Sequence, residues 1–407
     1  MSFFRLLIIC SLLAVPLAAQ APPYTILVSF DGFRWDYANR GITPNLERVA
    51  REGVSALSLE PVFPSKTFPN HISLVTGLHP AHHGIILNAF DDPFSGETYR
   101  MGGGRESLRQ AKWYLGEFFW ETAERQGITT ASYFWPGSEL DSTNRRPTYR
   151  HYYDHGRPYE TRVEGVLEWL QLPLPERPRF ITLYFHETDS RGHEAGPDSP
   201  EIDRAIAKVD SLLGMLLAGL ERIGRLDSTN VITVSDHGMT AVSPERVIEV
   251  EPLTGDIPCR FIDAGTMVMV RPERPADTAA LLARLKAAAA GQSFRALARE
   301  EMPDYWAFSD HPFIAPILLV ADPGWTLATA AMAERIYANP GGGAHGYDNH
   351  HLDMHGLFRA MGPSFKLGYR TGTVRTIDVY PLLCAIYGIQ PRANIDGRLE
   401  RIGFVLK

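Results

Sequence analysis

Continuous runs of β-prone hydrophobic residues alternate along the chain with helical patterns. The runs lie at Tyr24–Phe30, Thr129–Phe134, Arg179–Phe185 and Asn230–Val234. A hydrophobic run without polar alternation is typical of a strand that is buried on both faces of a parallel sheet. Apolar residues at helical spacing mark the intervening helices, of which Glu201–Ile223 is the longest. The pattern predicts an α/β fold, with a central, mainly parallel sheet and helices on both faces.

Start and stop signals bound several shorter predicted helices. Pro44–Arg51 begins with a proline and ends before Gly53. Trp113–Arg125 is predicted as one helix that Gly127 ends, and Ile377–Tyr387 as the closing helix.

The region from about residue 249 to residue 339 has a different pattern of hydrophobic runs from the rest of the chain. It contains a β-prone run at Gly265–Val270, an alanine-rich helical stretch at Ala276–Ala290 and a further apolar run at Pro316–Val320. These patterns predict a small α+β insertion on the main sheet. We expect it to be a subdomain within one large domain that covers residues 22–407.

The first 21 residues have the pattern of a signal peptide. Arg5 precedes a short apolar stretch at Leu6–Leu17, and small residues follow at Ala18–Ala21. The apolar stretch is too short for a standard transmembrane helix, although a retained N-terminal anchor is the alternative. We therefore expect residues 1–21 to be removed and the mature chain to be secreted or periplasmic, without a membrane span.

Two cysteines lie beyond this segment, Cys259 and Cys384. They are too few for a disulfide framework or a cysteine-rich zinc site. They could pair in an oxidising compartment or remain two buried thiols.

Composition and charge limit the class of partner. The chain has 407 residues and a net charge of −7, with positive and negative residues interspersed. Proteins that bind nucleic-acid polymers along the backbone carry basic patches, so such a partner is not expected. A small phosphate ester, held by metal ions, remains compatible with this charge.

Thr67 is predicted to lie at the N-terminus of a helix. Pro69 falls in the first turn, and the apolar residues Ile72, Leu74 and Val75 follow. A hydroxyl in this position lies where free N–H groups and the helix dipole favour an anion such as phosphate. The ordinary alternative is a threonine that caps the helix.

Acidic residues follow three of the predicted buried strands, as Asp31, Asp189 and Asp236. The carboxyl ends of parallel strands meet at one edge of a sheet, where ligands bind. Carboxylates and imidazoles without a thiolate suit zinc or a similar divalent ion, and the number of candidates suits two ions. Each residue alone could instead belong to a turn or to the surface. The candidate metal ligands are Asp31, Thr67, Asp189, His193, Asp236, His237 and His345.

Several blocks of sequence carry a family resemblance. They are Phe30–Arg34, Lys66–His71, Thr76–Pro80, His83–Ile85, Phe134–Ser138, Asp189–Pro197, Ser235–Met239 and His345–Asn349. In this order they resemble the nucleotide pyrophosphatase/phosphodiesterase family of the alkaline phosphatase superfamily, from about Tyr24 to Arg398. The resemblance implies an alkaline-phosphatase-like fold and a bacterial-type, secreted member of the family.

The resemblance also implies a ligand set for two zinc ions. One ion would be held by Asp189, His193 and His345. The other would be held by Asp31, Asp236 and His237, with Thr67 as a hydroxyl ligand.

The resemblance further assigns roles at the substrate. Thr67 would be the nucleophile and form a phospho-threonine, Asn88 would bind the oxyanion, and Phe68 and Tyr184 would contact the base. The predicted activity is hydrolysis of nucleotide phosphodiester and pyrophosphate bonds to release nucleoside 5'-monophosphate. The alternatives are a lysophospholipid or choline-headgroup phosphodiesterase on the same site and a non-catalytic binding protein on this fold. The stretches Leu115–Trp120 and His186–Thr188 differ from those of the best-known nucleotide-cleaving members and are predicted to lie near the leaving group.

Overall fold

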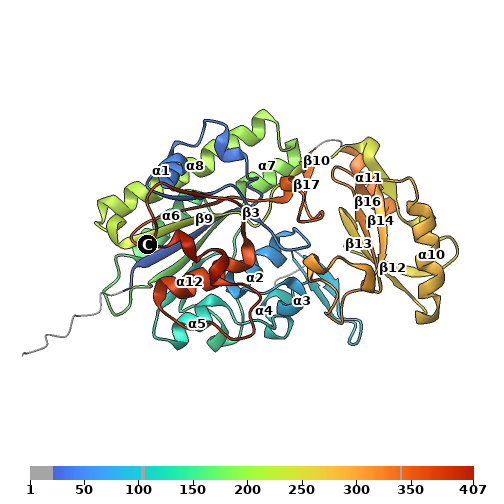
Figure 1. Ribbon diagram of the computed structural model, residues 1–407, viewed down its shortest axis with the longest axis horizontal. Coiled ribbons are helices and arrows are strands. Elements are labelled where there is room, and N and C mark those ends of the chain that lie inside the picture. The colour runs from blue at the N-terminus through green and yellow to red at the C-terminus, as the bar shows by residue number, and fades with distance from the viewer. Residues whose placement is uncertain (1–21, 102–105, 340–341) are drawn as a thin grey trace, which may run out of the picture.

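The computed structural model describes residues 22–101, 106–339 and 342–407 (Figure 1). The predicted signal peptide, residues 1–21, lies outside the described residues. Within the described ranges, no helix combines the length and the apolar character needed to cross a bilayer.

The central sheet has eight strands in the order β19-β2-β18-β9-β1-β8-β6-β7. β1 (Tyr24–Phe30) lies between β8 (Phe180–Phe185) and β9 (Thr229–Val234), is parallel to both, and is buried along its whole length. β6 (Thr130–Tyr133) continues the parallel arrangement, whereas β18 (Phe358–Met361) runs antiparallel to β9. The remaining strands are β2 (Gly53–Ala56), β7 (Tyr149–His151) and β19 (Tyr369–Thr371). The prediction of a mainly parallel sheet is confirmed, and it missed three short strands, β7, β18 and β19.

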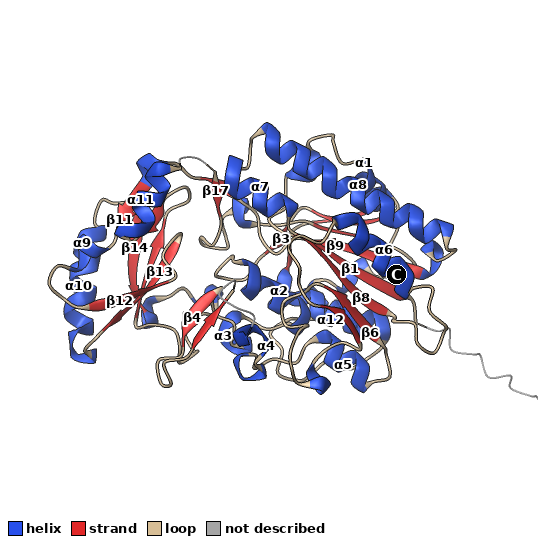
Figure 2. Ribbon diagram, turned by 180° about the vertical axis from the view of Figure 1, so that it is seen from behind, coloured by secondary structure: helices blue, strands red, loops and turns tan. Residues whose placement is uncertain are grey.

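Helices cover both faces of this sheet (Figures 1 and 2). One layer consists of α1 (Pro44–Arg51), α6 (Tyr159–Trp169), α7 (Glu187–Ala195) and α8 (Pro200–Arg222). The other consists of α2 (Thr67–Thr76), α5 (Phe119–Arg125) and α12 (Val379–Tyr387). The α/β class predicted from the sequence is confirmed.

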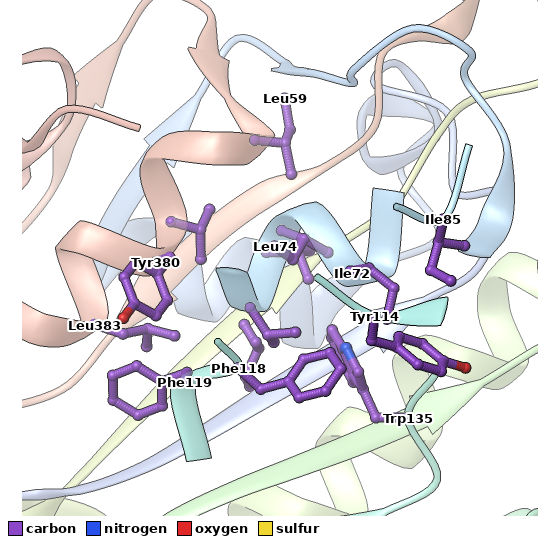
Figure 3. Packing of buried hydrophobic residues seen from close by; sticks show 14 of the residues in the cluster. Leu59, Ile72, Leu74, Ile85, Tyr114, Phe118, Phe119, Trp135, Tyr380 and Leu383 are labelled. Carbon is purple, nitrogen blue, oxygen red and sulfur yellow. The ribbon is translucent and has the colours of Figure 1, made fainter. Parts of the chain in front are cut away.

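α2 is the central helix of its layer. Every residue of α2 except Phe68 is buried. Leu74 packs in one hydrophobic cluster with Phe119 of α5 and with Tyr380 and Leu383 of α12 (Figure 3). A helix that is surrounded in this way is held rigidly, because each side chain contacts neighbours in a close-packed interior. The N-terminus of α2 therefore has a fixed position relative to the sheet.

Asp210 on α8 binds the N-terminus of α1. Its Oδ1 accepts a hydrogen bond from the Leu46 backbone N–H at 2.8 Å, and its Oδ2 accepts from the Asn45 N–H at 3.1 Å. The first N–H groups of a helix have no partner within the helix, so this buried carboxylate satisfies them from outside.

Replacing Asp210 by alanine is expected to lower the free energy of unfolding by about 2 kcal/mol, because it leaves buried N–H groups without an acceptor. Urea denaturation followed by circular dichroism measures the change. Asp203→Ala is the matched control on the same helix. Its half-exposed carboxylate pairs with Arg40, so the loss should stay below about 1 kcal/mol. Equal losses in both variants would contradict the role given to Asp210.

A second, four-stranded antiparallel sheet has the order β12-β13-β15-β14. Its strands are β12 (Cys259–Ile262), β13 (Met267–Pro272), β14 (Phe294–Ala298) and β15 (Ile317–Ala321). The helices beside it are α9 (Glu251–Thr254), α10 (Thr278–Ala289) and α11 (Ala330–Ala338). This unit has its own hydrophobic cluster and is the small α+β part of the fold. Cys259 and Cys384 are both free thiols.

Short elements connect these layers. They are α3 (Pro80–His83), α4 (Glu106–Arg109), β3 (Leu59–Glu60) with β20 (Val374–Arg375), β4 (Ala89–Asp91) with β5 (Thr98–Arg100), β10 (Thr240–Ala241) with β17 (Gly343–Ala344), and β11 (Val247–Glu249) with β16 (Thr326–Ala328). β17 lies between the two larger sheets (Figures 1 and 2).

The helix predicted at Trp113–Arg125 is shorter in the structure. Only Phe119–Arg125 is α-helical, so the first half of the prediction was wrong. The Leu115 N–H donates to the His83 carbonyl at 2.9 Å instead of to a helical partner. A tertiary hydrogen bond therefore replaces helical bonding just before Gly116, a residue with low helix propensity.

Candidate metal centre and active site

The ends of β1, β8 and β9 bring acidic residues to one edge of the central sheet. Asp31 follows β1 and Asp236 follows β9. Asp189 lies on α7, a helix that begins directly after β8 and that the sequence pattern did not predict. Gly32, with a φ of +67°, lets Asp31 approach α7 closely, since a Cβ on this glycine would be 2.8 Å from the Asp189 Cα.

Asp189, His193 and His345 form one cluster. The His193 Nε2 lies 3.3 Å from the Asp189 Oδ1, and the His345 Nε2 lies 3.6 Å from the same oxygen. The Nδ1 atoms lie 2.8 Å and 2.9 Å from the carbonyl oxygens of Gly343 and Ser65. A carbonyl oxygen only accepts, so each Nδ1 carries a proton and donates it. Both Nε2 atoms therefore point toward the shared carboxylate, as in a metal site.

Asp31, Asp236, His237 and Thr67 form the neighbouring cluster. The His237 Nε2 lies 3.0 Å from the Asp236 Oδ2, 3.4 Å from the Asp31 Oδ1 and 3.3 Å from the Thr67 Oγ1. The His237 ring stacks on the His345 ring with centroids 3.5 Å apart, which joins the two clusters. The structure thus brings together all seven residues that the sequence marked as candidate ligands.

Three carboxylate oxygens in these clusters lack a hydrogen-bond partner. Asp31 Oδ1, Asp189 Oδ1 and Asp236 Oδ2 are buried, and none finds a donor in the part of the chain that the structure describes. A buried carboxylate oxygen without a partner is costly in free energy. Carboxylates that face imidazole nitrogens at one point are the donor set of a divalent cation site. The residues therefore fit bound metal ions.

The electrostatics of the clusters agree with this fit. Burial raises the pKa of the Asp31 carboxyl well above its ordinary value, and the carboxylates of Asp236 and Asp189 raise it further. Burial lowers the pKa of His193, but the Asp189 carboxylate outweighs this and raises it to about 9. Burial and two neighbouring imidazoles keep the pKa of His345 well below its ordinary value. A cation would favour the ionised carboxylates and the neutral imidazoles together.

Thr67 is the first residue of α2, and Lys66 occupies the N-cap position. The alternative of an ordinary threonine cap was therefore wrong, because the Thr67 hydroxyl is not in the capping position. The hydroxyl faces His237 instead.

His71 was missed as a site residue by the sequence reasoning. This buried imidazole has its Nε2 2.8 Å from the Ser29 Oγ and its Nδ1 2.9 Å from the Thr67 carbonyl oxygen. The same Nδ1 lies 3.3 Å from the Asp236 Oδ2. His71 stands four residues after Thr67 on α2, and residues at this spacing share a helix face, so the helical pattern contained the signal.

Asn88 is anchored beside the N-terminus of α2. Its Oδ1 accepts the backbone N–H of Phe68 at 3.0 Å. Since an amide oxygen accepts and an amide nitrogen donates, this contact assigns the orientation of the side chain. The Asn88 amide nitrogen remains as a donor, since no described residue accepts from it.

An aromatic cavity of about 330 Å³ opens next to Thr67. Phe68 and Tyr184 line it, and the Tyr184 hydroxyl also donates to the Asp31 Oδ2 at 2.5 Å. Tyr153, which the sequence reasoning missed, lines the same cavity, with its ring 6.1 Å from that of Tyr184. No motif marks Tyr153, because it lies in a loop that only the fold brings to the site.

His186, which was predicted to lie near the leaving group, lines the aromatic cavity together with Phe68 and Tyr184, and its ring stacks on that of His155 with centroids 3.9 Å apart. A second cavity, of about 390 Å³, lies on the other side of the clusters. Lys66, Asn88 and His345 are among its lining residues.

Comparison with known proteins agrees with the resemblance seen in the sequence. Residues 25–348 match the family described as type I phosphodiesterase / nucleotide pyrophosphatase. The ectonucleotide pyrophosphatase/phosphodiesterase family member 1 of Rattus norvegicus is 37% identical over 387 residues, which cover 93% of this chain and 42% of the relative. The bis(5'-adenosyl)-triphosphatase of Xenopus laevis is 34% identical over 376 residues, 92% of this chain and 80% of that protein. The chain thus spans less than half the length of the rat relative.

The fold has close counterparts among solved structures. Murine ectonucleotide pyrophosphatase/phosphodiesterase 5, an inactive threonine-to-alanine variant in complex with AMP, matches with a TM-score of 0.87 and 30% identity, over 95% of this chain and 100% of that chain. The human protein of the same name matches with a TM-score of 0.86 and 31% identity, over 94% and 100% of the two chains. This agreement confirms the alkaline-phosphatase-like fold. The match in sequence and in structure across most of its length shows that the chain belongs to the nucleotide pyrophosphatase/phosphodiesterase family of the alkaline phosphatase superfamily.

Proposed function

We propose that this chain is a secreted, zinc-dependent hydrolase that cleaves phosphodiester and pyrophosphate bonds of nucleotides and releases nucleoside 5'-monophosphate. One observation carries the proposal: buried carboxylate oxygens that find no donor among the described residues face imidazoles, beside a threonine hydroxyl at the start of a buried helix. The names of the rat and frog relatives point to the same class of reaction.

Two zinc ions are proposed for the two clusters. Zinc bound there would lower the pKa of the threonine hydroxyl and stabilise the charge of the departing oxygen. One ion would be held by Asp189, His193 and His345, and the other by Asp31, Asp236, His237 and Thr67.

Thr67 is proposed as the nucleophile. Its Oγ1 gives its proton to water, attacks phosphorus and forms a phospho-threonine, while the bond between phosphorus and the leaving oxygen breaks. The departing oxygen keeps the electron pair and takes a proton from water. A water molecule then attacks the phospho-threonine, which releases nucleoside 5'-monophosphate and restores the hydroxyl. The inactive threonine-to-alanine variant of the murine relative is a precedent for a required threonine.

Asn88 is proposed to stabilise the oxyanion. Its oxygen is held by the Phe68 N–H, and no described residue accepts from its amide nitrogen, which can therefore donate to a non-bridging phosphate oxygen. A donor that is fixed before the reaction needs no reorganisation in the transition state.

Asn88→Ala should lower kcat by roughly 10²- to 10³-fold, the usual loss for one oxyanion donor. Asn88→Asp is the matched variant, because it keeps an acceptor for the Phe68 N–H but has no donor. Steady-state kinetics with a nucleotide ester, together with thermal melting, measure both effects. Activity near the wild-type level in Asn88→Asp would exclude the role as donor.

The aromatic cavity is proposed to hold the base. Stacking of a base on an aromatic side chain is worth roughly 1–3 kcal/mol. Phe68 and Tyr184 were predicted for this role, and Tyr153 adds a further ring on the same cavity. The murine neighbour was solved with AMP, which supports a nucleotide as ligand.

A product assay over a panel of substrates tests the proposed function. The panel contains ATP, a dinucleotide, a cyclic dinucleotide, p-nitrophenyl thymidine monophosphate and glycerophosphocholine. The nucleotides should give nucleoside 5'-monophosphate, with kcat/KM well above that for glycerophosphocholine. The reverse ranking would favour a choline-headgroup phosphodiesterase. No turnover of any substrate by protein with bound metal would favour a binding protein.

Export of the mature chain, residues 22–407, is part of the proposal. The signal-peptide pattern of residues 1–21 supports it, and so do relatives that carry the names ectonucleotide pyrophosphatase and venom phosphodiesterase. N-terminal sequencing of the protein recovered from outside the cytoplasm tests both the export and the cleavage.

A further inference from the structure

The second cavity lies between the metal-ligand clusters and the α+β unit. Lys66, His193 and His345 form its wall on the side of the central sheet. Its opposite wall includes Met332 and Ile336, both on α11. Its volume of about 390 Å³ falls in the range of small-molecule sites. Asn88, His193 and His345 line it as well, but none of the roles proposed above concerns the side of the cavity that α11 forms.

We propose that this cavity binds the leaving group of the substrate and that it favours an uncharged organic leaving group, such as a nucleoside, over pyrophosphate. The proposal rests on the proposed function and deepens it. It adds a specificity site on α11 to the reacting residues on the central sheet.

The second cavity lies on the side of the site where the leaving group is expected, as the sequence of contacts from Thr67 to His345 indicates. Thr67 lines the aromatic cavity, and its Oγ1 lies 3.3 Å from the His237 Nε2. The His237 ring stacks on His345, which lines the second cavity. In an in-line displacement the nucleophile and the leaving oxygen stand on opposite sides of phosphorus. An attack from Thr67 on a nucleotide whose base lies in the aromatic cavity therefore sends the leaving group toward the second cavity.

The charge of the lining argues against pyrophosphate. Among the described residues that line the second cavity, Lys66 is the one lysine or arginine. Its Nζ is paired with the Asp263 carboxylate, and the lysine is 8% exposed. Sites for phosphate groups usually present arginine forks or several cations. Away from the metal-ligand clusters, a single lysine whose charge is offset by the Asp263 carboxylate does not form such a site.

The opposite wall has the chemistry of a neutral, partly apolar ligand. Val242, Met332 and Ile336 add aliphatic side chains to the lining of the cavity, and Ser243 and Thr266 add hydroxyls, of which that of Thr266 donates to the His345 carbonyl at 3.1 Å. Apolar walls with a few polar groups are typical of sites for uncharged small molecules. A sugar or nucleoside can bury carbon atoms there and still donate or accept hydrogen bonds.

The reaction balances without a further reactant. For the dinucleoside monophosphate ApA, the bond from the Thr67 Oγ1 to phosphorus forms as the bond from phosphorus to the 3' oxygen breaks. The 3' oxygen keeps the electron pair and takes a proton, so adenosine leaves uncharged. Water then splits the phospho-threonine, and the products are AMP and adenosine.

A pair of substrates that both release AMP isolates the leaving-group side. ApA releases adenosine, and ATP releases pyrophosphate, so the contribution of the aromatic cavity is the same for both. The measured quantity is the ratio of kcat/KM for ApA to kcat/KM for ATP. Comparing this ratio between variants cancels the different intrinsic reactivities of the two leaving groups.

Ile336→Lys is the test variant, because it puts a cation on the apolar wall. We expect it to lower the ratio by about tenfold, by favouring pyrophosphate and disfavouring adenosine. Ala338→Lys is the matched control. It adds the same charge to the same helix at an exposed position, about 200° around the axis from Ile336. Thermal melting shows that both variants are folded.

The outcomes separate this inference from the proposed function. A ratio that falls in Ile336→Lys and stays within about twofold of wild type in Ala338→Lys supports the leaving-group site. If the enzyme cleaves both substrates and the two variants give the same ratio, the inference is overturned and the proposed function stands. If the metal-loaded wild type cleaves neither substrate, the proposed function fails, and the inference fails with it.

Discussion

Thr67→Ala is expected to abolish turnover while the protein stays folded. As the proposed nucleophile, Thr67 forms the bond to phosphorus, so its loss should lower kcat by roughly 10³-fold or more. The structural cost should be small, because the Thr67 hydroxyl does not cap α2 and lies 3.3 Å from its nearest partner, the His237 Nε2. Turnover, thermal melting and metal content are measured on the same sample.

A serine variant and an acid-quench experiment test the same assignment of Thr67. Thr67→Ser keeps a hydroxyl, so it should retain part of the activity, with a change that reflects the freer rotamers of serine. Acid quenching during turnover should trap phosphate on Thr67 in the wild type and in Thr67→Ser, and not in Thr67→Ala. A metal-loaded Thr67→Ala protein that turns over near the wild-type rate would falsify the assignment of the nucleophile.

Metal removal is expected to have a comparably large effect. Prolonged chelation should abolish activity, and added zinc should restore it, because the buried carboxylates of Asp31, Asp189 and Asp236 need cations nearby. The melting temperature should fall on chelation as well, since a ligand that binds only the folded state stabilises it. Full activity in protein that elemental analysis shows to be metal-free would contradict the metal centre.

The raised pKa of His193 predicts that zinc binds more tightly as the pH rises. In the metal-free protein this pKa is raised to about 9, so the imidazole is protonated at pH 7 and must lose its proton to bind metal. The apparent zinc affinity should therefore rise by about tenfold per pH unit between pH 7 and pH 9 and level off above it. His193→Ala should lose one zinc per chain. His350→Ala, at an exposed ring that stacks on Tyr305, should keep the wild-type zinc content.

The parts of the fold that could be predicted are those that one stretch of sequence determines. Tyr24–Phe30 is hydrophobic at nearly every position because both faces of the strand are covered, and its bounds in the structure are the predicted ones. The helix at Trp113–Arg125 was mispredicted where a hydrogen bond from Leu115 to a distant carbonyl overrides local propensity. β18 was missed because a short antiparallel strand carries little signal of its own.

The site residues also divide into those that could be predicted from the sequence and those that could not. The acidic residues could be predicted because Asp31, Asp189 and Asp236 share the position just after a buried strand. Tyr153 and the wall that Ile336 forms could not be predicted, because loop and insertion residues reach a site only through the fold. Periodicity determines which face of an element is buried, and it does not determine which distant surface that face meets.

The position of β1 has a consequence for how the chain is made. β1 is the first strand to be synthesised, and its two neighbours, β8 and β9, follow at Phe180–Phe185 and Thr229–Val234. A nascent chain therefore carries a largely hydrophobic strand with at least one unpaired edge until more than half of the polypeptide has been synthesised. Pairing over such sequence distances slows folding, and exposed edges favour aggregation in the meantime. Expression yield should therefore depend on chaperone capacity and growth temperature more strongly than the stability of the finished protein would suggest.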